Sequence, residues 1–134
     1  MRKGVLAAVL LGTALAATGC QRLNYSKKFN LNPAAVQPIH FGAPAYEQKV
    51  KVTIAASGGA VSAYLVKSDD APKVEVTLGG EREPAASLLL GSRVSRGNAE
   101  TYSFEATAPA KVPYTLLLRA DPKPCEVTVT VTGR

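Results

Sequence analysis

The feature that most constrains the fold is an alternation of apolar and polar residues with a period of two. Between residues 48 and 56, Val50, Val52 and Ile54 alternate with lysine and threonine. Residues 125–132 repeat the pattern with a cysteine and three valines against one glutamate and three threonines. Such alternation predicts β-strands that have one buried and one solvated face.

Similar short segments lie between turn signals that recur every eight to twelve residues. Pro38 lies inside one of them, and because proline cannot donate to a ladder, we expect that strand at a sheet edge or bulged. Ser57, Gly58 and Gly59 indicate a hairpin loop between two neighbouring strands. Beyond the two segments above, we expect strands at residues 25–31, 36–41, 61–66, 74–78, 100–107 and 112–120.

Residues 84–90 leave two alternatives open. The segment could be a helical turn that begins at Pro84, or a buried strand, because seven residues are too few to decide. No helical period in the sequence extends beyond ten residues, which argues against α/β winding. We therefore predict an all-β fold, a single antiparallel β-sandwich of about eight strands over residues 25–134.

The first twenty residues indicate export. Arg2 and Lys3 precede residues 4–18, an uncharged stretch rich in leucine, alanine and valine. This stretch is shorter than the roughly 20 apolar residues of a membrane-spanning helix. A basic start followed by a short apolar run is typical of a cleavable secretory signal.

Residues 15–20, Leu-Ala-Ala-Thr-Gly-Cys, resemble the lipobox of bacterial lipoproteins. The resemblance implies cleavage after Gly19 and a diacylglyceryl group on the Cys20 thiol, although Ala17 stands where the family prefers leucine. It divides the chain into a signal peptide, a lipidated tether and the domain, at residues 1–19, 20–24 and 25–134. The alternative is an ordinary secretory signal that leaves Cys20 free.

A lipid on Cys20 would anchor the protein to a membrane of the cell envelope. By the enterobacterial sorting rule, Gln21 after the cysteine implies the periplasmic face of the outer membrane. The chain has 16 Lys and Arg against 10 Asp and Glu, and the signal removes two of the basic residues. No basic run exceeds Lys27 and Lys28, and the protein leaves the cytoplasm, so we expect an envelope protein or a glycan as partner and not nucleic acid.

Few residues could carry catalysis. His40 is the only histidine, a Ser-His-Asp triad would need it, and the sequence contains no Gly-x-Ser-x-Gly. Cys125 could be a nucleophile with His40 as its base. Its parity with Val127 instead predicts a buried, unreactive thiol. One histidine and two cysteines cannot build a four-ligand zinc site, and we expect no enzymatic activity, metal or cofactor.

The charged clusters have no spacing that indicates a site. A calcium loop needs six or more oxygens from spaced groups, and the pairs Asp69–Asp70 and Glu81 with Glu83 do not supply them. Three arginines could meet an anionic glycan or a lipid headgroup, although we favour solvated loop charges as their explanation: Arg82, Arg93 and Arg96.

Residues 59–66, Gly-Ala-Val-Ser-Ala-Tyr-Leu-Val, resemble a strand of the pre-peptidase C-terminal type of β-sandwich, an accessory domain of secreted bacterial proteins. Residues 102–109 followed by 114–118 resemble that family's aromatic strand, Ala-Pro turn and returning tyrosine strand. Ser62 and Ala63 stand where the family often has aspartate, so the resemblance supports the fold and no calcium site.

Together these observations predict a non-enzymatic, membrane-anchored envelope lipoprotein that acts as a binding or structural accessory module. The alternative is a small carbohydrate- or peptidoglycan-binding module that uses loops at one end of the sandwich.

Overall fold

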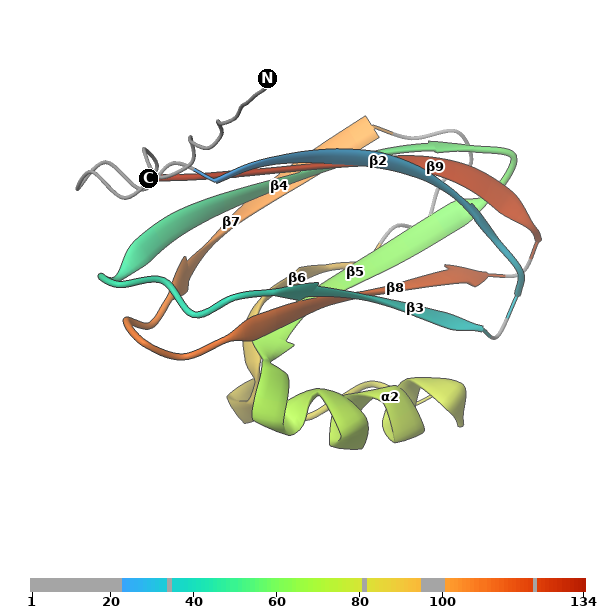
Figure 1. Cartoon of the computed structure of the whole chain (residues 1–134). Coiled ribbons are helices and arrows are strands. Elements are labelled where there is room, and N and C mark those ends of the chain that lie inside the picture. The colour runs from blue at the N-terminus through green and yellow to red at the C-terminus, as the bar shows by residue number, and fades with distance from the viewer. Residues whose placement is uncertain (1–22, 34, 81, 95–100, 122) are drawn as a thin grey trace, which may run out of the picture.

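The computed structural model describes residues 23–33, 35–80, 82–94, 101–121 and 123–134. These residues form two four-stranded antiparallel sheets that face each other, as predicted (Figure 1). In spatial order, the first sheet contains β2 (Leu23–Leu31), β9 (Cys125–Gly133), β4 (Gln48–Ser57) and β7 (Thr101–Ala108). The second sheet contains β3 (Val36–Phe41), β8 (Tyr114–Asp121), β5 (Ala60–Lys67) and β6 (Leu89–Arg93).

Strands that follow one another in the sequence mostly lie in different sheets. Every connection crosses from one sheet to the other except that between β5 and β6, which contains the helix α2 (Ala71–Gly79). The hairpin predicted at Ser57, Gly58 and Gly59 is therefore wrong, because β4 pairs with β7 and β9 and β5 pairs with β6 and β8. Gly58, with a φ of 96°, instead turns the chain between the sheets.

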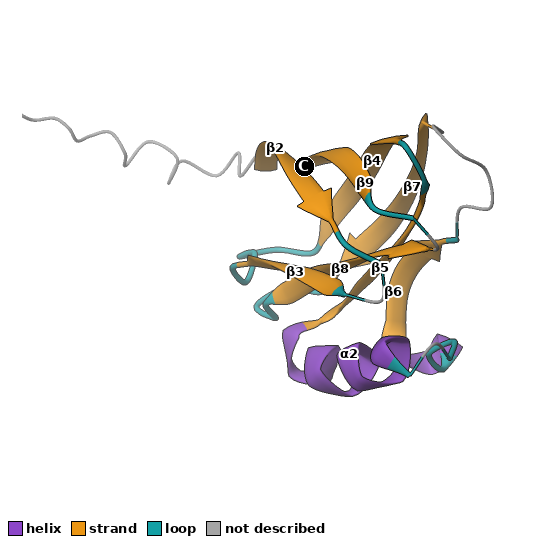
Figure 2. Cartoon of the chain, turned by 90° about the vertical axis from the view of Figure 1, so that its right-hand side faces the viewer, coloured by secondary structure: helices purple, strands orange, loops and turns teal. Residues whose placement is uncertain are grey.

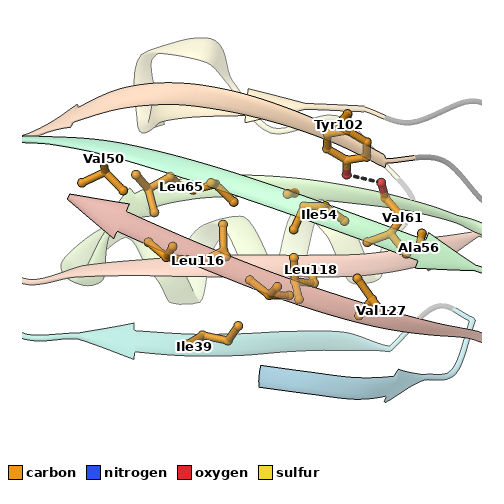
Figure 3. Packing of buried hydrophobic residues seen from close by; sticks show 14 of the residues in the cluster. Ile39, Val50, Ile54, Ala56, Val61, Leu65, Tyr102, Leu116, Leu118 and Val127 are labelled. Carbon is orange, nitrogen blue, oxygen red and sulfur yellow. Dashed lines mark hydrogen bonds between the residues drawn. The ribbon is translucent and has the colours of Figure 1, made fainter. Parts of the chain in front are cut away.

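The space between the sheets is filled by the alternating apolar residues. Ile54 and Val129 from the first sheet are fully buried, as the alternation predicts, and they belong to one core cluster with Leu116 from the second sheet. Figure 3 shows Ile54 and Leu116 within this cluster. The Tyr102 hydroxyl donates a hydrogen bond to the Val61 carbonyl across this interior. These side chains form one continuous core that holds the two layers together.

The strand predicted at residues 74–78 is wrong, because this segment lies within α2. Ala71, Val74 and Leu78 are buried against the second sheet, which is the i, i+3, i+7 spacing of a helical face. Val76 has the same parity as Val74 but is 71% exposed. Pro72 is at the start of the helix, where its missing amide costs nothing.

The helix gives the second sheet a second buried face (Figure 2). Beneath α2 lies a separate cluster that contains Tyr64, Val66 and Leu117. Consequently β5 is buried at every position from Ala60 to Val66, without the alternation of β4.

Two further expectations concern local structure. Pro38 lies in β3, which is an edge strand of the second sheet, as predicted. The segment at 84–90 is neither alternative alone: a single 3₁₀ turn (Ala86–Leu88) leads directly into β6. At the start of the domain, β2 begins at Leu23, two residues before the expected strand.

Candidate functional site

Cys20, the predicted lipidation site, lies outside the described residues. The described chain begins three residues later, where Leu23 pairs with Gly133 at one end of β2. Among the described residues, no helix is long and apolar enough to cross a membrane. Lipidation of Cys20 therefore stays a prediction, and the structure locates the place from which a tether would leave the domain.

A hollow of about 730 Å³ lies at this end of the first sheet. Strand alternation turns Lys49 and Lys51 to the outer face, beside Thr132 on β9 and Asn24 on β2. Cationic, hydroxyl and amide groups in one hollow fit a polar or anionic ligand. Its lining in the described chain contains no aromatic ring: Leu23, Asn24, Lys49, Val50, Lys51, Glu105, Thr132, Gly133 and Arg134.

A smaller recess of about 220 Å³ opens between the two sheets at the same end. Phe41 and Tyr114 stack there with ring centroids 5.1 Å apart, and Tyr25 meets Phe41 edge-on at 5.4 Å. The Tyr114 hydroxyl donates a hydrogen bond of 3.1 Å to Oε1 of Gln48. Burial raises the pKa of Tyr114 to about 12. Phe41 and Tyr114 therefore close the end of the core at the base of this recess.

His40 is exposed on the face of β3 opposite Ile39 and Phe41. Its Nδ1 lies 3.1 Å from the hydroxyl oxygen of Thr115, which lies 2.8 Å from that of Ser68. This row links β3, β8 and the turn before α2. Ser68 does not meet the imidazole directly, so the row lacks the serine–histidine contact of a nucleophilic site.

Cys125 is 6% exposed and belongs to the core between the sheets. Burial raises the pKa of its thiol, against a smaller lowering by a hydrogen bond with the backbone of Ser57. His40 lies beyond the second sheet, on the side that faces away from this core. The structure therefore separates the two residues that a cysteine–histidine mechanism would need to bring together.

The remaining charged candidates are dispersed. The Arg93 guanidinium lies 5.2 Å from the ring centroid of Tyr102, a cation–π contact on the side of the sandwich. Asp69 and Asp70 lie in the 3₁₀ turn before α2, and Arg82 follows the helix. Glu81 and Arg96 lie outside the described residues. Within the described chain, no group of three or more potential metal ligands gathers.

Sequence reasoning missed a polar cluster beneath the C-terminal end of α2. The Tyr64 hydroxyl donates a hydrogen bond of 3.2 Å to Oε2 of Glu83. Burial, followed by the charge of Glu83, raises the pKa of Tyr64. Nη1 of Arg119 donates to the Leu78 carbonyl at 3.1 Å, which places a cation at the negative end of the helix. The apolar runs at residues 63–66 of β5 and 116–118 of β8 were the signal that something covers this face.

Similarity to known proteins lies in the fold. No protein-family model and no curated protein matches the sequence. The structure is similar to the pre-peptidase C-terminal domain of a collagenase from Bacillus anthracis, with a TM-score of 0.54 and 14% identity over 81% of this chain and 89% of that one. This agrees with the resemblance in residues 59–66 and 102–118 at the level of the fold.

A second similarity, to a periplasmic inhibitor of g-type lysozyme from Aeromonas hydrophila, has a TM-score of 0.46 and 11% identity over 84% of this chain and 86% of that one.

Proposed function

We propose that the protein is a membrane-anchored envelope lipoprotein whose β-sandwich is a non-enzymatic binding or structural accessory module. The observation that carries the proposal is the position of Cys20, at the end of an apolar stretch and three residues before β2, where the described chain begins. A lipid there would anchor the domain directly. The separation of His40 from Cys125 supports the non-enzymatic part of the proposal.

Metabolic labelling with a palmitate analogue tests the anchor. The chain has two cysteines, so Cys125→Ala is a matched control for Cys20→Ser. We expect label on the wild type and on Cys125→Ala, and an unlabelled, unprocessed precursor for Cys20→Ser. Label that persists on Cys20→Ser would contradict the proposal.

The outer membrane is the proposed location in a Gram-negative cell. The residue after the cysteine is Gln21. Under the enterobacterial sorting rule, Gln21→Asp should move the protein from outer- to inner-membrane fractions in a density gradient. Identical fractionation of both forms would remove the support that Gln21 gives to this location.

A second candidate function is binding of an anionic glycan or peptidoglycan. The specific observation in its favour is the hollow that Lys49 and Lys51 line at one end of the first sheet. Sedimentation with purified peptidoglycan tests it, with Lys49→Glu/Lys51→Glu compared with the control Lys67→Glu/Lys73→Glu, whose lysines are also exposed. Loss of binding in the first variant alone would favour this function, and equal binding by both would contradict it.

A further inference from the structure

One end of the sandwich gathers the first residue of β2 and two loops, and we name it the tether end: Leu23 with residues 42–47 and 109–113. Leu23 pairs with Gly133, which also pairs with Val50 near the start of β4. Leu23 lines the small recess together with Phe41 and residues 42–44. The two loops lie side by side at this end (Figure 1).

A backbone contact holds the two loops together. The amide of Lys111 donates a hydrogen bond of 2.6 Å to the carbonyl of Pro44. Lys111 has a φ of 63°, a left-handed conformation that is uncommon for residues other than glycine. The loops therefore form one surface.

The length of chain outside the described structure limits where this surface can lie. Cys20 precedes Leu23 by three residues, and three extended residues span at most about 11 Å. If Cys20 carries a lipid, its glyceryl group lies at the headgroup layer of the membrane. The tether end is then the part of the domain nearest that layer, a step that rests on the proposed lipid anchor.

Tyr46 gives this end the chemistry of a headgroup contact. It lies in the loop of residues 42–47 and is 70% exposed. Tyrosine is enriched at membrane–water interfaces, where the ring meets apolar atoms and the hydroxyl stays hydrated. Two other large apolar side chains of the described chain are exposed elsewhere. Val76 lies on α2, and Val94 follows β6, which runs away from the tether end.

The charges at the tether end are mixed, so a net positive charge does not attract this end to anionic lipid headgroups. Lysines 49, 51 and 111 and Arg134 lie with two carboxylates, those of Glu47 and Glu105. Asp69 and Asp70 follow Ser68, whose amide donates to the Pro113 carbonyl at 2.9 Å. An aromatic contact is therefore expected to act on zwitterionic as well as anionic lipid.

We infer that the tether end docks on the lipid headgroup layer, with Tyr46 as its contact residue. The strands then lead away from the membrane. The nine residues of β2 cover about 30 Å at 3.3 Å per residue. The loops beyond Leu31 and Ser57 therefore face away from the bilayer, where a partner in the envelope would reach them.

The test places a fluorophore at single engineered cysteines of the full lipidated chain, in a Cys125→Ala background. The protein is reconstituted into phosphatidylcholine vesicles that carry a nitroxide on the lipid headgroup. The positions are Ala43→Cys, exposed in the same loop as Tyr46 and leaving Tyr46 in place, Val76→Cys on α2, and Asn30→Cys, seven residues along β2 from Leu23. We expect at least threefold stronger quenching at position 43 than at 76 or 30.

Flotation with the vesicles distinguishes a failure of the lipid anchor from a failure of the docking. Protein that does not float lacks the anchor, which overturns the proposed function and this inference together. Protein that floats but is quenched equally at all three positions, or most strongly at 76, keeps its anchor and overturns the docking alone.

A second pair of variants isolates the role of Tyr46. A fluorophore at Ala43→Cys, an exposed position in the same loop, is compared with and without Tyr46→Ser. Quenching at position 43 should fall at least twofold when Tyr46 is replaced. Unchanged quenching would contradict the assignment of Tyr46 as the contact residue.

Discussion

The two sheets of the sandwich differ in how many of their faces are buried. In the first sheet, β4 alternates between buried and exposed or half-buried positions along its whole length. In the second sheet, β5 is buried from Ala60 to Val66, because α2 covers the face that the first sheet does not. The first sheet therefore offers the larger open face, since the helix occupies much of the outer face of the second.

The largest expected change in stability comes from shortening two neighbouring side chains of β8. Leu116 faces the first sheet and Leu117 faces α2, and both are fully buried. Leu116→Ala and Leu117→Ala should each lower the free energy of unfolding by about 2–5 kcal/mol. In the first sheet, Ile54→Ala should cost the same, whereas Lys51→Ala should change stability by less than about 0.5 kcal/mol.

Denaturant unfolding followed by circular dichroism measures these four values. A change of less than about 0.5 kcal/mol for Leu117→Ala would mean that α2 does not cover the second sheet in solution.

The helix itself can be tested with two valines. Val74→Ala removes buried methyl groups and should cost about 1.5–2 kcal/mol, at about 0.8 kcal/mol for each buried carbon. Val76→Ala should stabilise the protein by a few tenths of a kcal/mol, because alanine has the higher helix propensity and little burial is lost. Thermal or denaturant unfolding measures both, and equal destabilisation by the two would instead support a strand.

The difference between the two sheets also explains which secondary structure elements could be predicted from the sequence. Where one face is wet, as in β4 and β9, the alternation identified the strands and their buried residues, including Ile54 and Val129. In β5, which is buried on both faces, the sequence identified the strand but not the helix that covers its outer face. Residues 74–78 have a strand's parity, but the contact with the second sheet selects a helix.

Topology and the candidate site were less accessible to sequence. The turn at Gly58 has the residue types of a hairpin loop. However, β4 and β5 lie in different sheets, and their apolar side chains meet across the core between the sheets. The hollow at the tether end combines Asn24, Lys51 and Thr132 from three strands that are distant in sequence. No local motif encodes such a combination, because it depends on strand order and register.

A smaller effect is expected from Tyr114, at the tether end of the second sheet. Burial raises its pKa to about 12, above the usual value of 10, so the folded state favours the neutral phenol. The stability that this group contributes is complete below pH 10 and is lost as the pH rises towards 12. Loss of its hydrogen bond to Gln48 in Tyr114→Phe should cost about 0.5–1.5 kcal/mol at pH 7.

Unfolding curves between pH 9 and 12 measure both effects. Lysine deprotonation is common to the two proteins, so the wild type should lose stability more steeply than Tyr114→Phe. Parallel curves would show that ionisation of Tyr114 does not oppose folding.

The last prediction concerns reactivity on the two faces of β9. Cys125 lies on the inner face, and burial raises the pKa of its thiol, so little thiolate forms at neutral pH. Thr132, on the same strand, lies on the outer face and is exposed. A thiol reagent should therefore modify Cys125 at least tenfold more slowly in the folded protein than in denaturant. The variant Thr132→Cys should gain one thiol that reacts rapidly in the folded state, and Cys125→Ala measures any reaction at Cys20. Rapid modification of native Cys125, or a dimer linked through it on a non-reducing gel, would show that the inner face of β9 opens to solvent. A buried thiol must become exposed before a reagent or a second chain can reach its sulfur.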